Sequence, residues 1–188
     1  VLLANGKVLL SGGYNSGNYF ISAELYDPAA NSWSSAANMT EARDGHTLTL
    51  LGNARVLAVG GPGQSNSKPA TTELYDPATN TWALTAPLNT GRWLQSATLL
   101  PGGNVLVAGG EGSNSVFLAS AEIYNAGSAS WTSTNAMITP RKVFGATLLN
   151  NGNVLVTGGW GAGDNPLKSA ELYVADDVVF RNGFESSP

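Results

Sequence analysis

Glutamate and arginine recur at a constant spacing along this chain of 188 residues. Intervals of 49 residues separate the members of two series: Glu24, Glu73, Glu122 and Glu171, and Arg43, Arg92 and Arg141. A buried arginine beside a carboxylate forms strong, directed hydrogen bonds, whereas a ring of exposed arginines would bind an anionic ligand. Because both residue types return in successive copies, we predict structural ion pairs for all seven residues.

Two sets of segments differ between the copies, one after each arginine and one after a recurring Gly-Gly pair. Their aromatic, amide, carboxylate and amine groups suit a sugar ring or a peptide, because aromatic faces stack on a ligand while polar groups bond its edges. The candidate ligand-binding residues are Tyr14, Tyr19, Phe20, Asp44, His46, Trp93, Gln95, Lys142, Phe144, Trp160 and Asp164. The alternative is that the aromatic side chains only cover the rim of a core.

The chain contains few of the side chains that commonly act in catalysis or bind zinc. His46 is the only histidine and there is no cysteine, so a catalytic triad or a zinc site has few candidate members. We therefore expect a protein that is not an enzyme and that uses no metal or cofactor.

Composition limits the partners further. Nine Lys and Arg residues are scattered singly in a chain of net charge −4, so we expect no nucleic-acid partner. No apolar run approaches the roughly 20 residues of a membrane-spanning helix. A composition with 23 Gly and only 12% charged residues indicates a turn-rich β protein with very little helix.

Each 49-residue period contains four segments that predict antiparallel β-strands. Strand a is expected at 46–51, 96–100 and 145–149, and strand b is the Val/Leu run before each Gly pair, which indicates burial on both faces. Strand c is AELYDP or a variant, an Asp-Pro-Ala-Thr-Asn type of turn follows, and strand d starts at the tryptophan. One such sheet cannot bury both faces alone, so successive sheets are expected to stack around an axis as propeller blades.

The order of arginine, apolar strand, Gly-Gly, Glu-x-Tyr-Asp and tryptophan resembles the kelch repeat over about residues 1–180. The sequence of the repeat is similar to that of bacterial kelch proteins related in fold to galactose oxidase. The resemblance implies an all-β propeller of about six or seven blades and says little about function. Galactose oxidase binds copper through tyrosine and histidine and cross-links one tyrosine to cysteine, so the lack of cysteine argues against that activity here.

We place four blades at 1–42, 43–91, 92–140 and 141–180, the first lacking the start of its strand a, and a polar tail at 181–188. A seven-bladed ring would need roughly 150 further residues at this period, so we expect the C-terminal part of a larger propeller. Closure by four blades is the alternative. If the four blades neither close nor belong to a larger propeller, their open edges would join copies of the chain into a homo-oligomer.

Strand order places the segments after each arginine and after each Gly pair on one side of the propeller. This loop face comprises 14–22, 44–46, 62–72, 93–95, 111–120, 142–144 and 160–169. The leading hypothesis is a non-catalytic module that binds a protein or glycan through the loop face. The alternatives are the propeller of a secreted oxidase or hydrolase with catalytic residues elsewhere, and a self-assembling structural fragment. The ending FRNGFE resembles tails of secreted bacterial proteins, which favours secretion or the cell surface.

Overall fold

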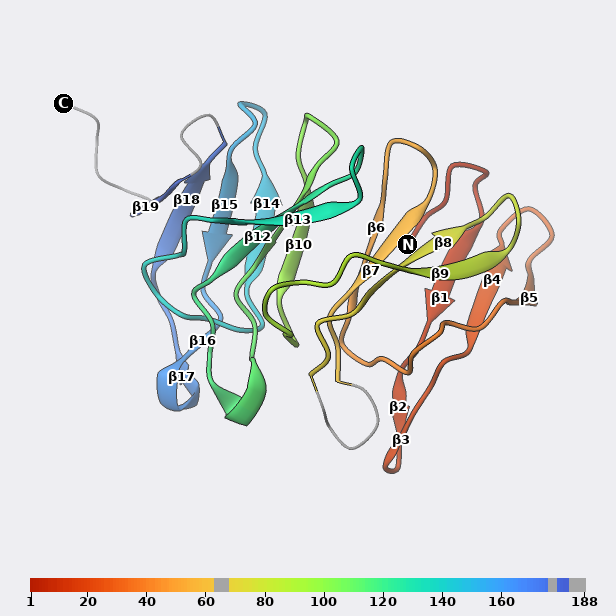
Figure 1. Cartoon of the computed structure of the whole chain (residues 1–188), viewed down its shortest axis with the longest axis horizontal. Helices are drawn as coiled ribbons and strands as arrows, with labels where there is room; N and C mark the ends of the chain where they lie inside the picture. The colour runs from red at the N-terminus through yellow and green to blue at the C-terminus, as the bar shows by residue number, and fades with distance from the viewer. Residues whose placement is uncertain (63–67, 176–178, 183–188) are drawn as a thin grey trace.

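The fold of this protein, seen in a computed structural model, consists of short antiparallel sheets (Figure 1). The structure describes residues 1–62, 68–175 and 179–182. Four sheets follow one another along the chain, three with four strands and the first with three. The predicted all-β architecture of successive antiparallel blades is confirmed.

The second blade shows the repeating unit. It comprises β6 (Thr47–Leu50), β7 (Val56–Val59), β8 (Thr72–Asp76) and β9 (Thr81–Thr85), each paired with its neighbour in that order. All four residues of β7 are buried, as a continuous Val/Leu run predicts for a central strand. Asp76 Oδ1 accepts the Ala78 N–H in the turn between β8 and β9, and Asn80 has a φ of 52° there.

The other blades repeat this unit. The third contains β10 (Ser96–Leu99), β11 (Val105–Ala108), β12 (Ala121–Asn125) and β13 (Ser130–Thr134). The fourth contains β14 (Gly145–Leu148), β15 (Val154–Thr157), β18 (Ala170–Val174) and β19 (Val179–Asn182). The first contains β1 (Val8–Ser11), β4 (Ala23–Asp27) and β5 (Ser32–Ala36). Strand β19 includes Arg181 and Asn182, which we had placed in the tail, and residues 183–188 lie outside the described part.

Apolar clusters fill the three junctions between neighbouring blades. One joins Leu9 and Ala23 of the first blade to Val56 and Tyr75 of the second, and equivalent clusters join the second to the third and the third to the fourth. No cluster in the described residues joins the fourth blade to the first. The sheets therefore form an open arc, as Figure 1 shows.

Tryptophans on the outer strands add polar links between blades. Trp82 Nε1 donates to the Ala37 carbonyl of the preceding blade at 3.0 Å, and Trp131 Nε1 donates to Ala86 at 2.9 Å. Each ring also packs against the tyrosine across the hairpin, with centroids 5.0 Å apart for Tyr75 and Trp82. The repeated Tyr and Trp are thus structural side chains.

The loop face carries the small additional elements, at the lower edge of Figure 1. They are β2 (Tyr14–Asn15) with β3 (Asn18–Tyr19), the 3-10 turns η2 (Ser113–Ser115) and η3 (Ala162–Asp164), and β16 (Trp160–Gly161) with β17 (Asn165–Pro166). No helix in the described ranges is long and apolar enough to cross a membrane.

Candidate functional site

Each repeated arginine in the structure is fully buried and pairs with the glutamate 30 residues later. Arg43 Nε lies 3.1 Å from Glu73 Oε1, while its Nη1 donates to the carbonyls of Gly60 and Thr71. The Glu73 carboxylate also accepts the N–H groups of Thr40 and Glu41. The ion pair therefore ties strand β8 to the segment that enters the same blade.

The next two blades repeat this arrangement. Arg92 Nη2 and Arg141 Nη2 each lie 2.7 Å from their glutamates, Glu122 and Glu171. Our prediction of an ion pair at Glu24 is wrong: this side chain is exposed and has no ion-pair partner among the described residues. The reason is the register, because an arginine 30 residues before Glu24 would fall ahead of residue 1.

Three candidate ligand-binding residues, His46, Gln95 and Phe144, lie between blades instead of on the open surface. Each follows an arginine by three positions and points at the first glycine of the preceding blade's Gly pair. A Cβ added at Gly12 would lie 2.9 Å from the His46 ring, and one at Gly109 would lie 2.7 Å from the Phe144 ring. The missing glycine side chain makes room for the neighbouring blade, so these residues act as spacers.

His46 is held neutral in this position. Its Nε2 lies 3.0 Å from Ser11 Oγ, and burial first, then the positive charge of Arg43, lowers the pKa of His46 to about 4. The unfolded chain therefore takes up a proton at a higher pH than the folded chain. Its contribution to stability is present above the ordinary pKa of about 6.5 and is lost as pH falls toward 4.

This linkage gives a direct prediction. Lowering the pH from 7 to 5 should reduce the free energy of unfolding by roughly 2 kcal/mol through His46 alone. The measurement is urea unfolding at both pH values, compared with His46→Gln, which places the residue of the third blade at this position. The variant should lose that part of the pH dependence. An NMR titration of the single histidine that gave a pKa near 6.5 would contradict the prediction.

On the loop face, the variable positions are paired by backbone hydrogen bonds. Trp93 and Glu111 exchange N–H and carbonyl bonds at 2.9 and 2.7 Å, and Lys142 and Trp160 do the same at 3.0 and 2.9 Å. In each pair, one residue directly follows a repeated arginine (Trp93 or Lys142) and the other directly follows a Gly-Gly pair (Glu111 or Trp160). Positions that vary between copies therefore lie side by side on an ordered backbone frame.

A network of charged side chains links these pairs across three blades. Glu111 is buried, and its carboxylate lies 3.1 Å from Lys68 Nζ of the second blade and 2.8 Å from Lys142 Nζ of the fourth. Lys142 Nζ also lies 3.0 Å from Asp164 Oδ1 and 4.2 Å from the centre of the Phe117 ring. We call Lys68, Glu111, Lys142 and Asp164 the charge network.

The charge network stabilises its own ionised state. Burial alone raises the pKa of Glu111, but the hydrogen bonds and charges of Lys142 and Lys68 outweigh it and hold that pKa below its ordinary value. Burial alone lowers the pKa of Lys142, but Glu111 and Asp164 outweigh it and hold that pKa above its ordinary value. The network's contribution is therefore lost as pH falls through the Glu111 pKa or rises through the Lys142 pKa, and it is intact between them.

The aromatic candidates occupy different places. Trp160 is 43% exposed beside Lys142 and Asp164, and Trp93 is half-buried with its indole against Gly45. Tyr14 and Tyr19 pack on each other in the first blade's hairpin, with ring centroids 4.9 Å apart, next to the exposed Phe20. Asp44 is half-buried after Arg43. The structure thus gathers Lys142, Trp160 and Asp164 into one place and leaves the tyrosines apart from them.

Sequence reasoning missed two members of the charge network, Glu111 and Lys68. Glu111 carried a signal, because it is the only acidic residue directly after a Gly pair. Lys68 gave no such signal, since it stands in the variable segment 62–72, of which 63–67 lie outside the described residues. A Cβ at Gly91 would clash with the Lys68 carbonyl oxygen, so this glycine allows the approach of the backbone that carries Lys68.

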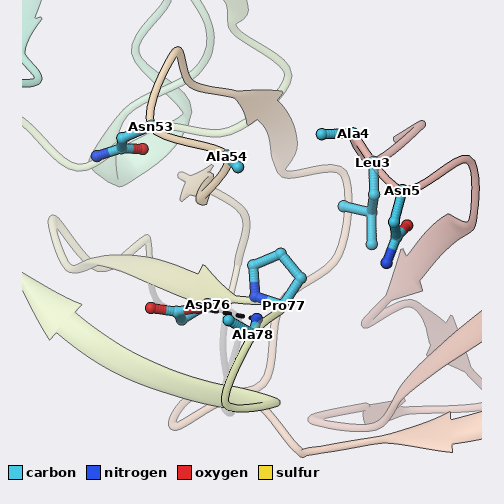
Figure 2. Close-up of a pocket in the computed structure, with 8 residues that line it drawn as sticks. All are labelled: Leu3, Ala4, Asn5, Asn53, Ala54, Asp76, Pro77 and Ala78. Atoms are coloured by element: carbon cyan, nitrogen blue, oxygen red, sulfur yellow. Dashed lines mark hydrogen bonds between the residues drawn. The ribbon is translucent and has the colours of Figure 1, made fainter.

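The opposite side of the propeller also has a cavity, shown in Figure 2. It has a volume of about 290 Å³ and lies between the turn at Leu3–Asn5, the turn at Asn53–Ala54 and the hairpin at Asp76–Ala78. Its polar groups are used within the turns: Asn53 Oδ1 accepts the Arg55 N–H, and Asp76 pairs with Arg55. We therefore read it as a gap between adjacent turns and place the candidate site on the loop face.

Comparisons with known proteins bear on the fold. Residues 1–40 match the Kelch motif, and no curated protein matches the sequence. A solved structure described as "Structure of YjhT" is similar, with a TM-score of 0.79 and 15% identity. The match covers 96% of this chain and 66% of that one, so the chain spans about two thirds of the length of that structure. At this identity the likeness shows the fold alone. Residues 1–40 therefore match the Kelch motif, and the fold of the described residues is similar to that of a β-propeller.

Proposed function

We propose that this protein is a non-catalytic interaction module that binds a protein or carbohydrate ligand through its loop face. The observation that supports the proposal is the charge network, which joins three blades and lies beside the aromatic side chains of Trp93, Phe117 and Trp160. The kelch propeller fold is commonly a protein-interaction module.

The blades themselves provide an internal comparison. Arg, Glu, Tyr and Trp keep the same structural roles in successive blades, so they build the scaffold. The positions after each arginine and each Gly pair keep their backbone pairing and change their side chains, from Trp93 with Glu111 to Lys142 with Trp160. A constant frame with changing side chains is the arrangement expected of a binding surface.

The test is binding to arrays of glycans and of peptides by the wild type and three variants. Trp93→Ala and Trp160→Ala each remove an aromatic side chain from the loop face, and Pro77→Ala changes the cavity on the opposite side. We expect each tryptophan variant to weaken binding about tenfold or more, with Pro77→Ala unchanged. Binding that survives both tryptophan changes would exclude the loop face.

A further inference from the structure

A cavity of about 240 Å³ opens beside the charge network, lined by Lys142, Val143, Trp160 and Asp164. Its floor is ordered, because Lys142 and Trp160 pair through both backbone hydrogen bonds and Trp160 begins the β16–β17 hairpin. The volume lies below the roughly 300–1,000 Å³ of pockets that hold drug-sized ligands. A single small ring is therefore the size of ligand that this cavity accommodates.

The charges of the cavity compensate each other. Lys142 Nζ contacts Glu111 Oε2 at 2.8 Å and Asp164 Oδ1 at 3.0 Å, which uses two of its three N–H groups. An anionic ligand would compete with two carboxylates for Lys142, and a cationic ligand at Asp164 would lie next to the lysine ammonium. A neutral ligand that carries hydroxyl groups can bond both side chains and leave the ion pairs intact.

Two groups at the cavity can bond such a ligand, the exposed Asp164 and Lys142, whose side chain is 15% exposed. The Asp164 side chain is 68% exposed and can accept hydrogen bonds from hydroxyl groups, while the third N–H of Lys142 can donate one. Trp160 presents an apolar face next to them. One apolar face with a few convergent polar groups matches the amphipathic surface of a sugar ring.

We propose that the cavity at Lys142, Trp160 and Asp164 binds one neutral pyranose ring, whose C–H face stacks on Trp160 while adjacent hydroxyls bond Asp164 and Lys142. This inference rests on the proposed function of the loop face and names the ligand class for one part of it. The sugar is a free monosaccharide or the terminal residue of a glycan.

The experiment is saturation-transfer NMR and competition titration with the methyl glycosides of glucose, galactose and mannose. Glucuronic acid, glucosamine and an arginine-containing peptide serve as charged comparators. Trp160→Ala and Asp164→Asn test the cavity, and Trp33→Ala is the matched control, because Trp33 is an exposed tryptophan on the first blade. We expect a neutral glycoside to bind with strongest saturation on one C–H face, and each cavity variant to weaken binding about tenfold while Trp33→Ala does not.

The other outcomes separate the two proposals. If only the charged sugars or the peptide bind, and Trp160→Ala abolishes that binding, the neutral-sugar inference is wrong and the loop face is retained. If a neutral glycoside binds equally to the wild type and to both cavity variants, the cavity is not its site. If the arrays and the titrations detect no binding that depends on the loop face, both proposals fail.

Discussion

Arg92→Gln should lower the free energy of unfolding by about 3–5 kcal/mol, the usual cost of removing one partner from a buried ion pair. Arg92 is fully buried and donates to the Glu122 carboxylate and to the carbonyls of Gly109 and Ser120. Glutamine cannot reach all of these acceptors, so the Glu122 charge would stay buried without its partner. Urea unfolding at pH 7 measures the change.

Two matched substitutions isolate the effect of burial. Arg55→Gln breaks the ion pair with Asp76, in which Nε and Oδ2 lie 3.1 Å apart on the surface, and should cost less than about 1 kcal/mol. Glu24→Gln changes the exposed member of the glutamate series and should alter stability by no more than about 0.5 kcal/mol. An Arg92→Gln variant that kept full stability but no longer bound ligand would show that the arginines bind the ligand and are not structural.

Gly110→Ala should be nearly as damaging and should destabilise the protein by as much as about 5 kcal/mol. Gly110 has a φ of +95°, and a Cβ there would lie 2.6 Å from the Trp93 carbonyl oxygen. The left-handed conformation costs alanine about 1–2 kcal/mol, and forcing an extra methyl group into a packed region costs about 1–3 kcal/mol more. The shift should also disturb the backbone pairing of Trp93 with Glu111 on the loop face.

The control for this prediction is Gly103→Ala. Gly103 also has a positive φ, +81°, but a Cβ at that position meets no atom within 4 Å. Its substitution should show the conformational cost alone, about 1–2 kcal/mol. Equal losses of stability in the two variants, measured by urea unfolding, would mean that close packing at the Gly pair contributes nothing.

The ion pairs could be predicted from the sequence because the arginine and the glutamate of each pair belong to the same blade. Arg43 with Glu73, and Arg92 with Glu122, are separated by the same 30 residues, so one repeat register describes both. Burial of strand b followed from its Val/Leu run for β7 and β11, which are fully buried, but Leu10 of β1 and Thr157 of β15 are exposed because their blades stand at the ends of the arc. The exception among the glutamates is Glu24, because the position 30 residues before it lies outside residues 1–188.

The sequence was less informative about residues that face a neighbouring blade. His46 and Gln95 stand in variable, polar segments, which favoured an exposed position. In the structure the Gly pair of the preceding blade leaves room for them, and Gln95 Nε2 donates to the Val59 carbonyl at 2.8 Å. Whether such a side chain points to solvent or into the junction depends on how two blades are rotated against each other.

What the sequence alone determined about this protein is the repeating unit: a period of 49 residues, blades of antiparallel strands and the Arg–Glu pairs inside them. Only the tertiary structure brought together Lys68, Glu111, Lys142 and Asp164, which come from three blades. The physical reason is that contacts within a blade follow from strand pairing at a constant register. Contacts between loops of different blades depend instead on the stacking of the blades and on loops that differ in length and sequence.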